Sequence, residues 1–195
     1  RKSALIWKSD YYTISSGKIS PYDDLIKQYS REIGWDWRLL ASLIFQESRF
    51  KPNAESWAGA YGLMQLMPSV LNRFEVEDKS SPRQNLRAGV EFLDWLDKQV
   101  KKLGIRDRQE RIKFVLAAYN VGLGHVLDAR RLAEKYGGDP DEWDVIKEYL
   151  LKKSNPEYYN DEVVYYGYAR GIETYNYVDQ ILDRYEHYKN IIAEG

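Results

Sequence analysis

Apolar residues recur three and four positions apart along most of the chain, which is the spacing of one face of an α-helix. The clearest run consists of Leu86, Val90, Leu93, Leu96, Val100 and Leu103. It is preceded by Ser81 as N-cap, Pro82 as first helical residue and Gln84 as partner in a capping box. No run of alternating apolar and polar residues between turn residues is apparent, so the pattern predicts an all-α protein.

The same spacing predicts several other helices. One begins with Ser20 as N-cap and Pro21 as its first residue, and it ends at Gly34. Another begins near Asp36 and ends before Phe50. Further helices are expected at about 112–121, 126–136, 141–153 and from 171, with a loop and a short helix in 53–68. The last helix is expected to bury Ile172, Tyr175, Val178, Ile181, Leu182 and Tyr185.

The composition is that of one globular domain and excludes several kinds of site. The chain has 195 residues, of which 44% are hydrophobic, and this length is enough for a sizeable core. It contains no cysteine, which excludes disulfides, thiol nucleophiles, iron–sulfur clusters and cysteine-ligated zinc. His125 and His187 lack the spacing of metal ligands, and no phosphate-binding loop is present. Neither a metal nor another cofactor is expected.

The charge pattern narrows the choice of partners. Lys and Arg number 29, Asp and Glu number 30, and the formal net charge is -1, with no long basic block. Nucleic acid is therefore not expected as a partner. No apolar run approaches the roughly 18 residues of a membrane span, so a soluble chain is expected, and we expect it to be a monomer.

A carboxylate interrupts the apolar stripe of the helix that begins near Asp36. Leu40, Leu43 and Ile44 lie on its predicted buried face, and Glu47 takes the next place on that face. In the wall of a cleft, desolvation raises the pKa of a carboxyl group, which then keeps its proton near neutral pH as a general acid must. The alternative is that Glu47 pairs with a cation or marks the fraying end of the helix.

The segment after Glu47 suits a sugar-binding wall. Residues 59–68 combine small residues, two methionines and an amide. Gln65 can donate to and accept from sugar substituents, and Met64 and Met67 adapt to an irregular apolar surface. The alternative is a short buried helix in which the methionines fill the core.

Nine tyrosines lie between residues 158 and 188. A tyrosine ring offers a flat apolar face to sugar C–H groups and a hydroxyl to the ring substituents. Tyr175 and Tyr185 are expected in the core because they lie on the apolar stripe of the last helix. Glu173 is a second candidate acid, although a glutamate near a helix start is more often solvated or favoured there by the helix dipole.

Taken in order, these residues resemble the catalytic domain of the soluble lytic transglycosylases. The motifs that carry the resemblance, over about residues 20–188, are Glu47-Ser48, Ser56 with Gly59-Ala60, Gly62-Leu63-Met64-Gln65, Pro68, Ala117-Ala118-Tyr119-Asn120 with Gly122, and Glu173-Thr174 with Tyr177-Val178. Other stretches resemble the F branch of the membrane-bound lytic murein transglycosylases, among them Leu127-Asp128-Ala129-Arg130, Asp141-Glu142-Trp143, Tyr158-Tyr159 and Tyr166-Gly167-Tyr168-Ala169-Arg170-Gly171.

The resemblance implies a lysozyme-like, mostly helical fold and peptidoglycan glycan strands as substrate. It implies cleavage of the β-1,4 bond between N-acetylmuramic acid and N-acetylglucosamine, with Glu47 as the single catalytic acid and then base, and a 1,6-anhydro product. By motif position, Ser56, Met64, Gln65 and Met67 would line sugar subsites. Tyr119 would orient Glu47, Asn120 would support the same wall, Glu173 would contact a sugar and Tyr177 would close the cleft. Trp57 departs from the smaller or β-branched residue that many relatives have.

The resemblance also bears on domains and location. Residues 1–18 are expected to be a linker or the tail of an N-terminal domain similar to periplasmic solute-binding proteins, and residues 19–195 the catalytic domain. The expected location is the periplasm or the outer membrane. Two alternatives are a hydrolytic muramidase similar to goose-type lysozyme and a glycan-binding module without activity. Retention of Glu47 argues against the second, because a binding module gains nothing from a desolvated acid.

Overall fold

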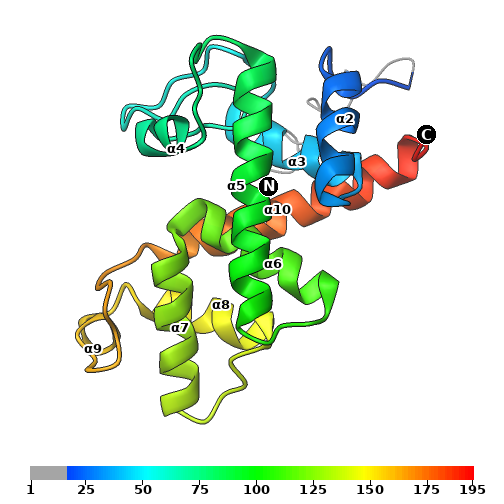
Figure 1. Ribbon diagram of the computed structural model, residues 1–195. Helices are drawn as coiled ribbons and strands as arrows, with labels where there is room; N and C mark the ends of the chain where they lie inside the picture. Colours follow the sequence, from blue (N-terminus) through cyan, green and yellow to red (C-terminus); the bar gives the residue numbers. More distant parts are fainter. Residues whose placement is uncertain (1–16) are drawn as a thin grey trace, which may run out of the picture. The chain divides into compact units, whose positions relative to one another are not determined.

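The computed structural model describes residues 17–195, and these residues form helices joined by loops (Figure 1). The helices are α2 (Asp23–Ile33), α3 (Trp37–Ser48), α4 (Pro68–Arg73), α5 (Pro82–Lys102), α6 (Arg108–Val121), α7 (Leu123–Lys135), α8 (Trp143–Lys152), α9 (Pro156–Tyr159) and α10 (Gly171–Ile191). Over this range the β structure is limited to isolated bridges, which join Tyr61 to Glu55 and to Leu66. The prediction of an all-α protein is confirmed. The predicted linker at 1–18 lies, except for its last two residues, outside the described part of the chain.

The described residues divide into two compact units. The first unit comprises the residues up to Val90 together with Ile181–Gly195, and the second comprises Glu91–Gln180. The first unit therefore holds α2, α3 and α4, and the second holds α6, α7, α8 and α9. The helices α5 and α10 contribute residues to both units.

The start of α2 differs from its prediction. The helix begins at Asp23, and its N-cap, Tyr22, makes no side-chain capping bond. Instead, the carboxylate of Asp23 reaches back and accepts hydrogen bonds from the backbone N–H groups of Ile19 and Ser20 and from the Ser20 hydroxyl. The Ser20 hydroxyl donates to Asp23, and its oxygen accepts from the backbone N–H of Tyr22 at 3.1 Å. The helix therefore begins two residues after its predicted start at Pro21, and Ser20 and Asp23 bond each other's part of the chain before it, much as in a capping box.

The start of α5 matches its prediction only in part. Ser81 Oγ accepts from the backbone N–H of Gln84 at 3.2 Å, as an N-cap does. The carboxamide of Gln84, however, does not close a capping box. Its oxygen accepts from the backbone N–H groups of Glu77 and Asp78, so it fixes the loop that precedes the helix.

The buried stripe of α10 is rotated from the predicted one at its first turn. Ile172 was expected in the core but is 49% exposed, whereas Val178 and Ile181 are fully buried as expected. Gly171 explains the difference, because a Cβ atom there would collide with the carbonyl group of Leu150. The helix therefore turns the side of Gly171 inward, and Ile172, the next residue, points away from it.

Candidate active site

Glu47 lies in the last turn of α3, at the margin of a core. Leu40, Leu43 and Ile44 on the same helix are fully buried, whereas Glu47 is half-buried. The chain leaves the helix sharply, because Arg49 and Phe50 both have left-handed backbone conformations with φ of 52° and 61°. A carboxyl group in such a place is partly shielded from water and still lies within reach of a ligand.

Arg184 from α10 braces the end of α3 that carries Glu47. It is 2% exposed, and its Nη1 donates to the carbonyl oxygen of Ser42 at 2.9 Å. Its Nη2 donates to Oε1 of Gln46 at 2.9 Å, and its guanidinium lies 4.4 Å from the ring centre of Phe45. Arg184 was not among the residues predicted from the sequence. An arginine on the apolar stripe of a helix is the same kind of signal that drew attention to Glu47.

Gln65 holds together the loop between α3 and α4. It has a left-handed conformation with φ of 48°, and its Nε2 donates to the carbonyl oxygens of Ala54 at 2.8 Å and Gly62 at 3.0 Å. Within residues 17–195 no donor reaches its Oε1. Gln65 was predicted both to donate to and to accept from a sugar. Because its amide protons bond the protein, its oxygen is the group left for a ligand.

Asn85 from α5 anchors the same loop from behind. Its side chain is buried, its Nδ2 donates to the carbonyl oxygen of Tyr61 at 2.9 Å, and its Oδ1 accepts from the backbone N–H of Met64 at 2.9 Å. Gly62 lies directly against this carboxamide with φ of 85°. Sequence reasoning missed Asn85, since an asparagine in the first turn of a helix is ordinarily a solvated or capping residue.

The two methionines of this loop differ in burial. Met64 is fully buried, and its sulfur fills the space beside Gly89 on α5. Met64 was expected to line a sugar subsite, but a side chain in this position does not. It fills the core, which was the alternative for this residue. Met67, at the start of α4, is 42% exposed and available for contact.

Ser56 closes a tight loop with an exposed tryptophan at its tip. Its Oγ accepts from the backbone N–H of Ala60 at 3.0 Å, and its own N–H donates to the Ala60 carbonyl oxygen at 2.9 Å. Trp57 next to it is fully exposed. Ser56 is half-buried, and its hydroxyl proton remains available for a ligand oxygen.

The second unit places four predicted site residues near the end of α6 and the start of α10. Tyr119 is half-buried, with its ring centre 5.5 Å from that of Phe92. Asn120 Oδ1 accepts from the hydroxyl of Thr174 at 2.7 Å, which joins the two helix ends. Glu173 is exposed in the first turn of α10, and Tyr177 is 5% exposed one turn further on. Thr174 was not predicted as a site residue on its own account.

Over residues 17–195, no group of three or more His, Cys, Asp or Glu side chains is placed to hold a metal ion. Over the same range, no helix combines the length and the apolar character needed to cross a bilayer.

Comparison with known proteins identifies the family. The family model described as Transglycosylase SLT domain matches residues 24–141. The chain belongs to this family. The matched range of the SLT domain includes Glu47, the 62–65 segment, Tyr119 and Asn120, and it ends before Glu173 and Tyr177. Membership confirms the resemblance and the expectation of an enzyme of the lytic transglycosylase type.

Two curated relatives of this SLT domain carry the same name. A membrane-bound lytic murein transglycosylase F from Haemophilus influenzae (strain PittEE) is 39% identical over 171 residues, which are 88% of this chain and 34% of that protein. The protein of the same name from Pasteurella multocida (strain Pm70) is 44% identical over 157 residues, or 80% of this chain and 31% of the relative. The chain thus spans about a third of the length of these relatives.

Solved structures show the same fold. The 70 kDa soluble lytic transglycosylase Slt70 from Escherichia coli matches with a TM-score of 0.59 and 22% identity, over 87% of this chain and 24% of that one. An inactive mutant of the lytic transglycosylase Slt from Pseudomonas aeruginosa matches with a TM-score of 0.56 and 23% identity, over 88% and 25%. The predicted lysozyme-like fold of lytic transglycosylases is confirmed.

Proposed function

We propose that this SLT domain cleaves the β-1,4 bond between N-acetylmuramic acid and N-acetylglucosamine in peptidoglycan without consuming water. The observation that supports this most is the placement of Glu47, a half-buried carboxyl group at the end of a helix braced by Arg184. The names of the curated relatives, which are lytic murein transglycosylases, support the choice of substrate.

In the proposed mechanism one carboxyl group acts twice. Protonated Glu47 donates its proton to the glycosidic oxygen while the bond from that oxygen to C1 of the muramoyl sugar breaks. The resulting carboxylate then takes the proton of the 6-hydroxyl of the same sugar as its oxygen bonds to C1. Glu47 is regenerated with its proton, and the product carries a 1,6-anhydro ring. Attack from within the sugar gains the entropic advantage of an intramolecular reaction.

The surroundings of Glu47 in sequence favour this mechanism over hydrolysis. Glycosidases that use water or a covalent intermediate generally need a second carboxyl group on the other side of the bond. In residues 48–68 the only other carboxylate is Glu55. It is exposed, and its backbone forms a bridge with Tyr61.

The remaining residues take supporting roles in the proposal. Ser56, Gln65 and Met67 contact sugar rings, with the Gln65 oxygen accepting from an acetamido N–H or a hydroxyl. In the second unit, Tyr119 and Asn120 form a wall that Thr174 joins to α10, and Glu173 binds a sugar. Tyr177 closes the cleft with the small part of its side chain that is exposed.

The proposal extends to location and to a partner domain. The relatives are named membrane-bound, and murein is a component of the cell envelope, so we place the chain at the periplasmic side of that envelope. Because the chain spans 34% of the Haemophilus relative, a solute-binding-like domain that regulates the catalytic domain accounts for part of the remaining length.

Digestion of purified peptidoglycan tests the reaction. The released muropeptides, analysed by mass spectrometry, are expected to end in anhydro sugars that are lighter by one water than reducing ends. Glu47→Gln keeps the shape of the side chain and is expected to lower the rate by about 10²–10⁴-fold, while Glu55→Gln, the matched control, leaves it unchanged. Reducing ends would instead establish a hydrolytic muramidase, and no release would favour a binding module.

A further inference from the structure

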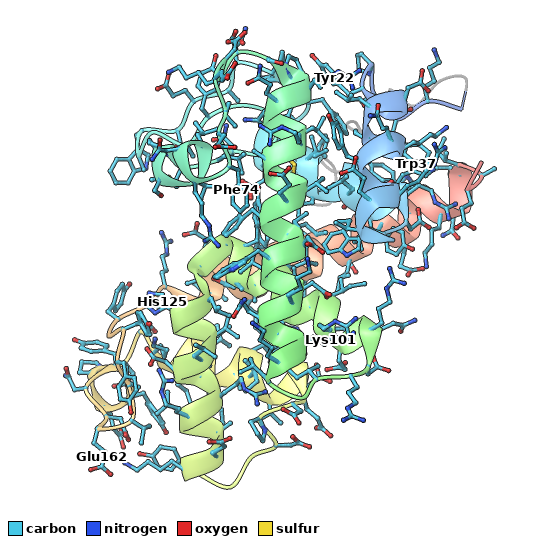
Figure 2. The ribbon with its side chains drawn as sticks, viewed as in Figure 1. Tyr22, Trp37, Phe74, Lys101, His125 and Glu162 are labelled. Carbon is cyan, nitrogen blue, oxygen red and sulfur yellow. The ribbon has the colours of Figure 1, made fainter. Side chains whose placement is uncertain are left out.

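Exposed tyrosines gather in one loop of the second unit. The large apolar side chains exposed in this unit are Tyr136, Tyr165, Tyr166, Tyr168 and Ile172. Three of them form the tyrosine loop, residues 165–168 between α9 and α10, with exposed fractions of 73% for Tyr165, 58% for Tyr166 and 57% for Tyr168. Figure 2 shows this region between the labelled side chains of His125, at the start of α7, and Glu162, in the loop after α9.

A buried carboxylate fixes the backbone of the tyrosine loop. Asp128 is fully buried, and its two oxygens accept from the backbone N–H groups of Tyr165 at 2.8 Å and Tyr166 at 2.9 Å. The same carboxylate pairs with Lys153 and Arg131, each at 2.5 Å. Burying such charges is unfavourable unless their hydrogen bonds are satisfied, and here the bonds to two cations and two loop amides satisfy the carboxylate. The loop is therefore held by a rigid base.

The rings themselves are braced on one side. The guanidinium of Arg131 lies 4.1 Å from the ring centre of Tyr165. The ring of Tyr166 lies against the first turn of α7. Gly124 leaves the room for it, since a Cβ atom there would come within 2.6 Å of the ring. The ring of Tyr168 meets that of Tyr159 edge to face at 5.8 Å. Each tyrosine is thus held in place while much of its surface remains in water.

The tyrosine loop borders the proposed sugar-binding residues of the second unit. Gly124, on which Tyr166 rests, follows Asn120 by four residues across the junction of α6 and α7. On the other side, the loop leads directly into α10, whose Thr174 bonds Asn120. A ligand that contacts Asn120 and extends along either helix end therefore reaches the tyrosines within the same unit.

We propose that Tyr165, Tyr166 and Tyr168 form an additional glycan-binding surface, which stacks on pyranose rings of a strand that continues beyond the proposed site. This inference rests on the proposed function. A sugar suits the surface because each ring offers an apolar face and a hydroxyl. Lys153 and Arg131 both direct their charges to the buried Asp128 carboxylate, so neither cation is aimed outward at a ligand from this surface. The exposed side chains of the loop include no aliphatic one of the kind that an acyl chain or an amphipathic helix would bind.

The test compares long and short glycans with matched variants. In Tyr165→Ala/Tyr166→Ala, KM for long peptide-free glycan strands is expected to rise about three- to tenfold, with kcat and the kinetics on a tetrasaccharide unchanged. Tyr165→Phe/Tyr166→Phe retains the stacking faces and is expected to stay within about twofold of the unaltered chain. Ile191→Ala is the control, since Ile191 is a 45% exposed apolar side chain at the end of α10, in the first unit.

The outcomes separate this surface from the proposed reaction. An unchanged KM for long strands in the double alanine variant would overturn the inference, and so would equal losses on long and short substrates, which indicate a structural role. Binding of long strands is also measured with Glu47→Gln in the background, where no cleavage interferes. Weaker binding there supports the surface whether the products carry anhydro or reducing ends. The products of the unaltered chain alone decide the reaction.

Discussion

The side-chain carboxamide of Asn85 occupies the space that a Cβ atom on Gly62 would need. This contact joins the first turn of α5 to the loop that carries Gln65. Because Gly62 also has φ of 85°, a side chain there would meet both backbone strain and a buried neighbour. The geometry of the loop therefore depends on a glycine and an asparagine that are 23 positions apart (85 − 62) in the sequence.

Gly62→Ala is expected to destabilise the protein by about 2–4 kcal/mol, from the strain of a positive φ and from overpacking. Urea unfolding measures the change, and the loop distortion is expected to lower cleavage as well. Gly104→Ala is the control, because Gly104 has φ of 99° with no atom within 4 Å of its added Cβ. If both variants lost the same stability, the contact with Asn85 would have no energetic role.

Asn85→Ala is expected to destabilise the protein by about 2–4 kcal/mol, because it removes the buried side-chain acceptor of the Met64 N–H and one of the two donors to the Tyr61 carbonyl. It also opens the space that Gly62→Ala needs. The double variant should therefore be more stable than the sum of the two single effects predicts, as a double-mutant cycle would measure. Additive effects would contradict the contact.

Arg184→Met tests the brace behind Glu47. The change removes the guanidinium donors to the Ser42 carbonyl and to the Gln46 amide oxygen, and a loss of about 2–4 kcal/mol is expected. Because the last turn of α3 carries Glu47 and loses its support, kcat should fall by a larger factor than KM rises. Lys189→Met on the exposed side of α10 is the control and should leave both unchanged. A loss of stability with kcat intact would limit Arg184 to a structural role.

The sequence predicted the helices better than it predicted the contacts between them. The apolar periods located α3, α5 and α10, and Gly34 ends α2 with φ of 66°, as expected. These features depend on residues close together in the chain. The core-facing stripe of α3 was also correct, so the unusual position of Glu47 could be recognised from the pattern alone.

Contacts between distant residues explain what sequence reasoning missed. Asn85 and Arg184 gain their roles from partners more than 20 positions away, and only Arg184, on the apolar stripe of α10, stands out from its local pattern. The burial of Met64 depends on Gly89, which provides room for its sulfur on α5. A methionine in a loop has the same sequence appearance whether it faces a ligand or the core.

Asp128→Asn tests the buried base of the tyrosine loop. Burial alone would raise the pKa of Asp128, but hydrogen bonds, first from Lys153, lower it, so the group is ionised in the folded protein. The substitution leaves the Lys153 ammonium buried without its counter-ion, and a loss of about 3–5 kcal/mol is expected. Asp94→Asn, in the exposed pair with Lys98, should change stability by less than about 1 kcal/mol.

The double variant Asp128→Leu/Lys153→Met separates charge burial from packing. Burial lowers the pKa of Lys153, and the bond to Asp128 opposes this shift. The buried ammonium group therefore destabilises the fold chiefly when the Asp128 carboxylate is absent. Removing both charges should recover part of the stability that Asp128→Asn loses. Equal losses in the two variants, measured by urea unfolding, would show that the amide bonds to the tyrosine loop matter more than the ion pair.

Asp161 gives the protein a defined acid dependence. The backbone N–H of Val163 first, and then Lys135 and the hydroxyl of Tyr136, lower the pKa of Asp161 to about 2. The pKa of an aspartate in an unfolded chain is about 3.9. The folded state therefore binds this proton less readily than the unfolded state does. The stabilising contribution is complete above that value and is lost as the pH falls toward 2.

Asp161→Asn removes this contribution. The difference in free energy of unfolding between the unaltered chain and the variant is therefore expected to be constant above about pH 5 and to shrink toward pH 2.5. Urea titrations at several pH values measure it, with Asp183→Asn as a control because Asp183 is exposed on α10. A difference that stays constant down to pH 2.5 would mean that the carboxylate of Asp161 does not hold the loop through Lys135, Tyr136 and Val163.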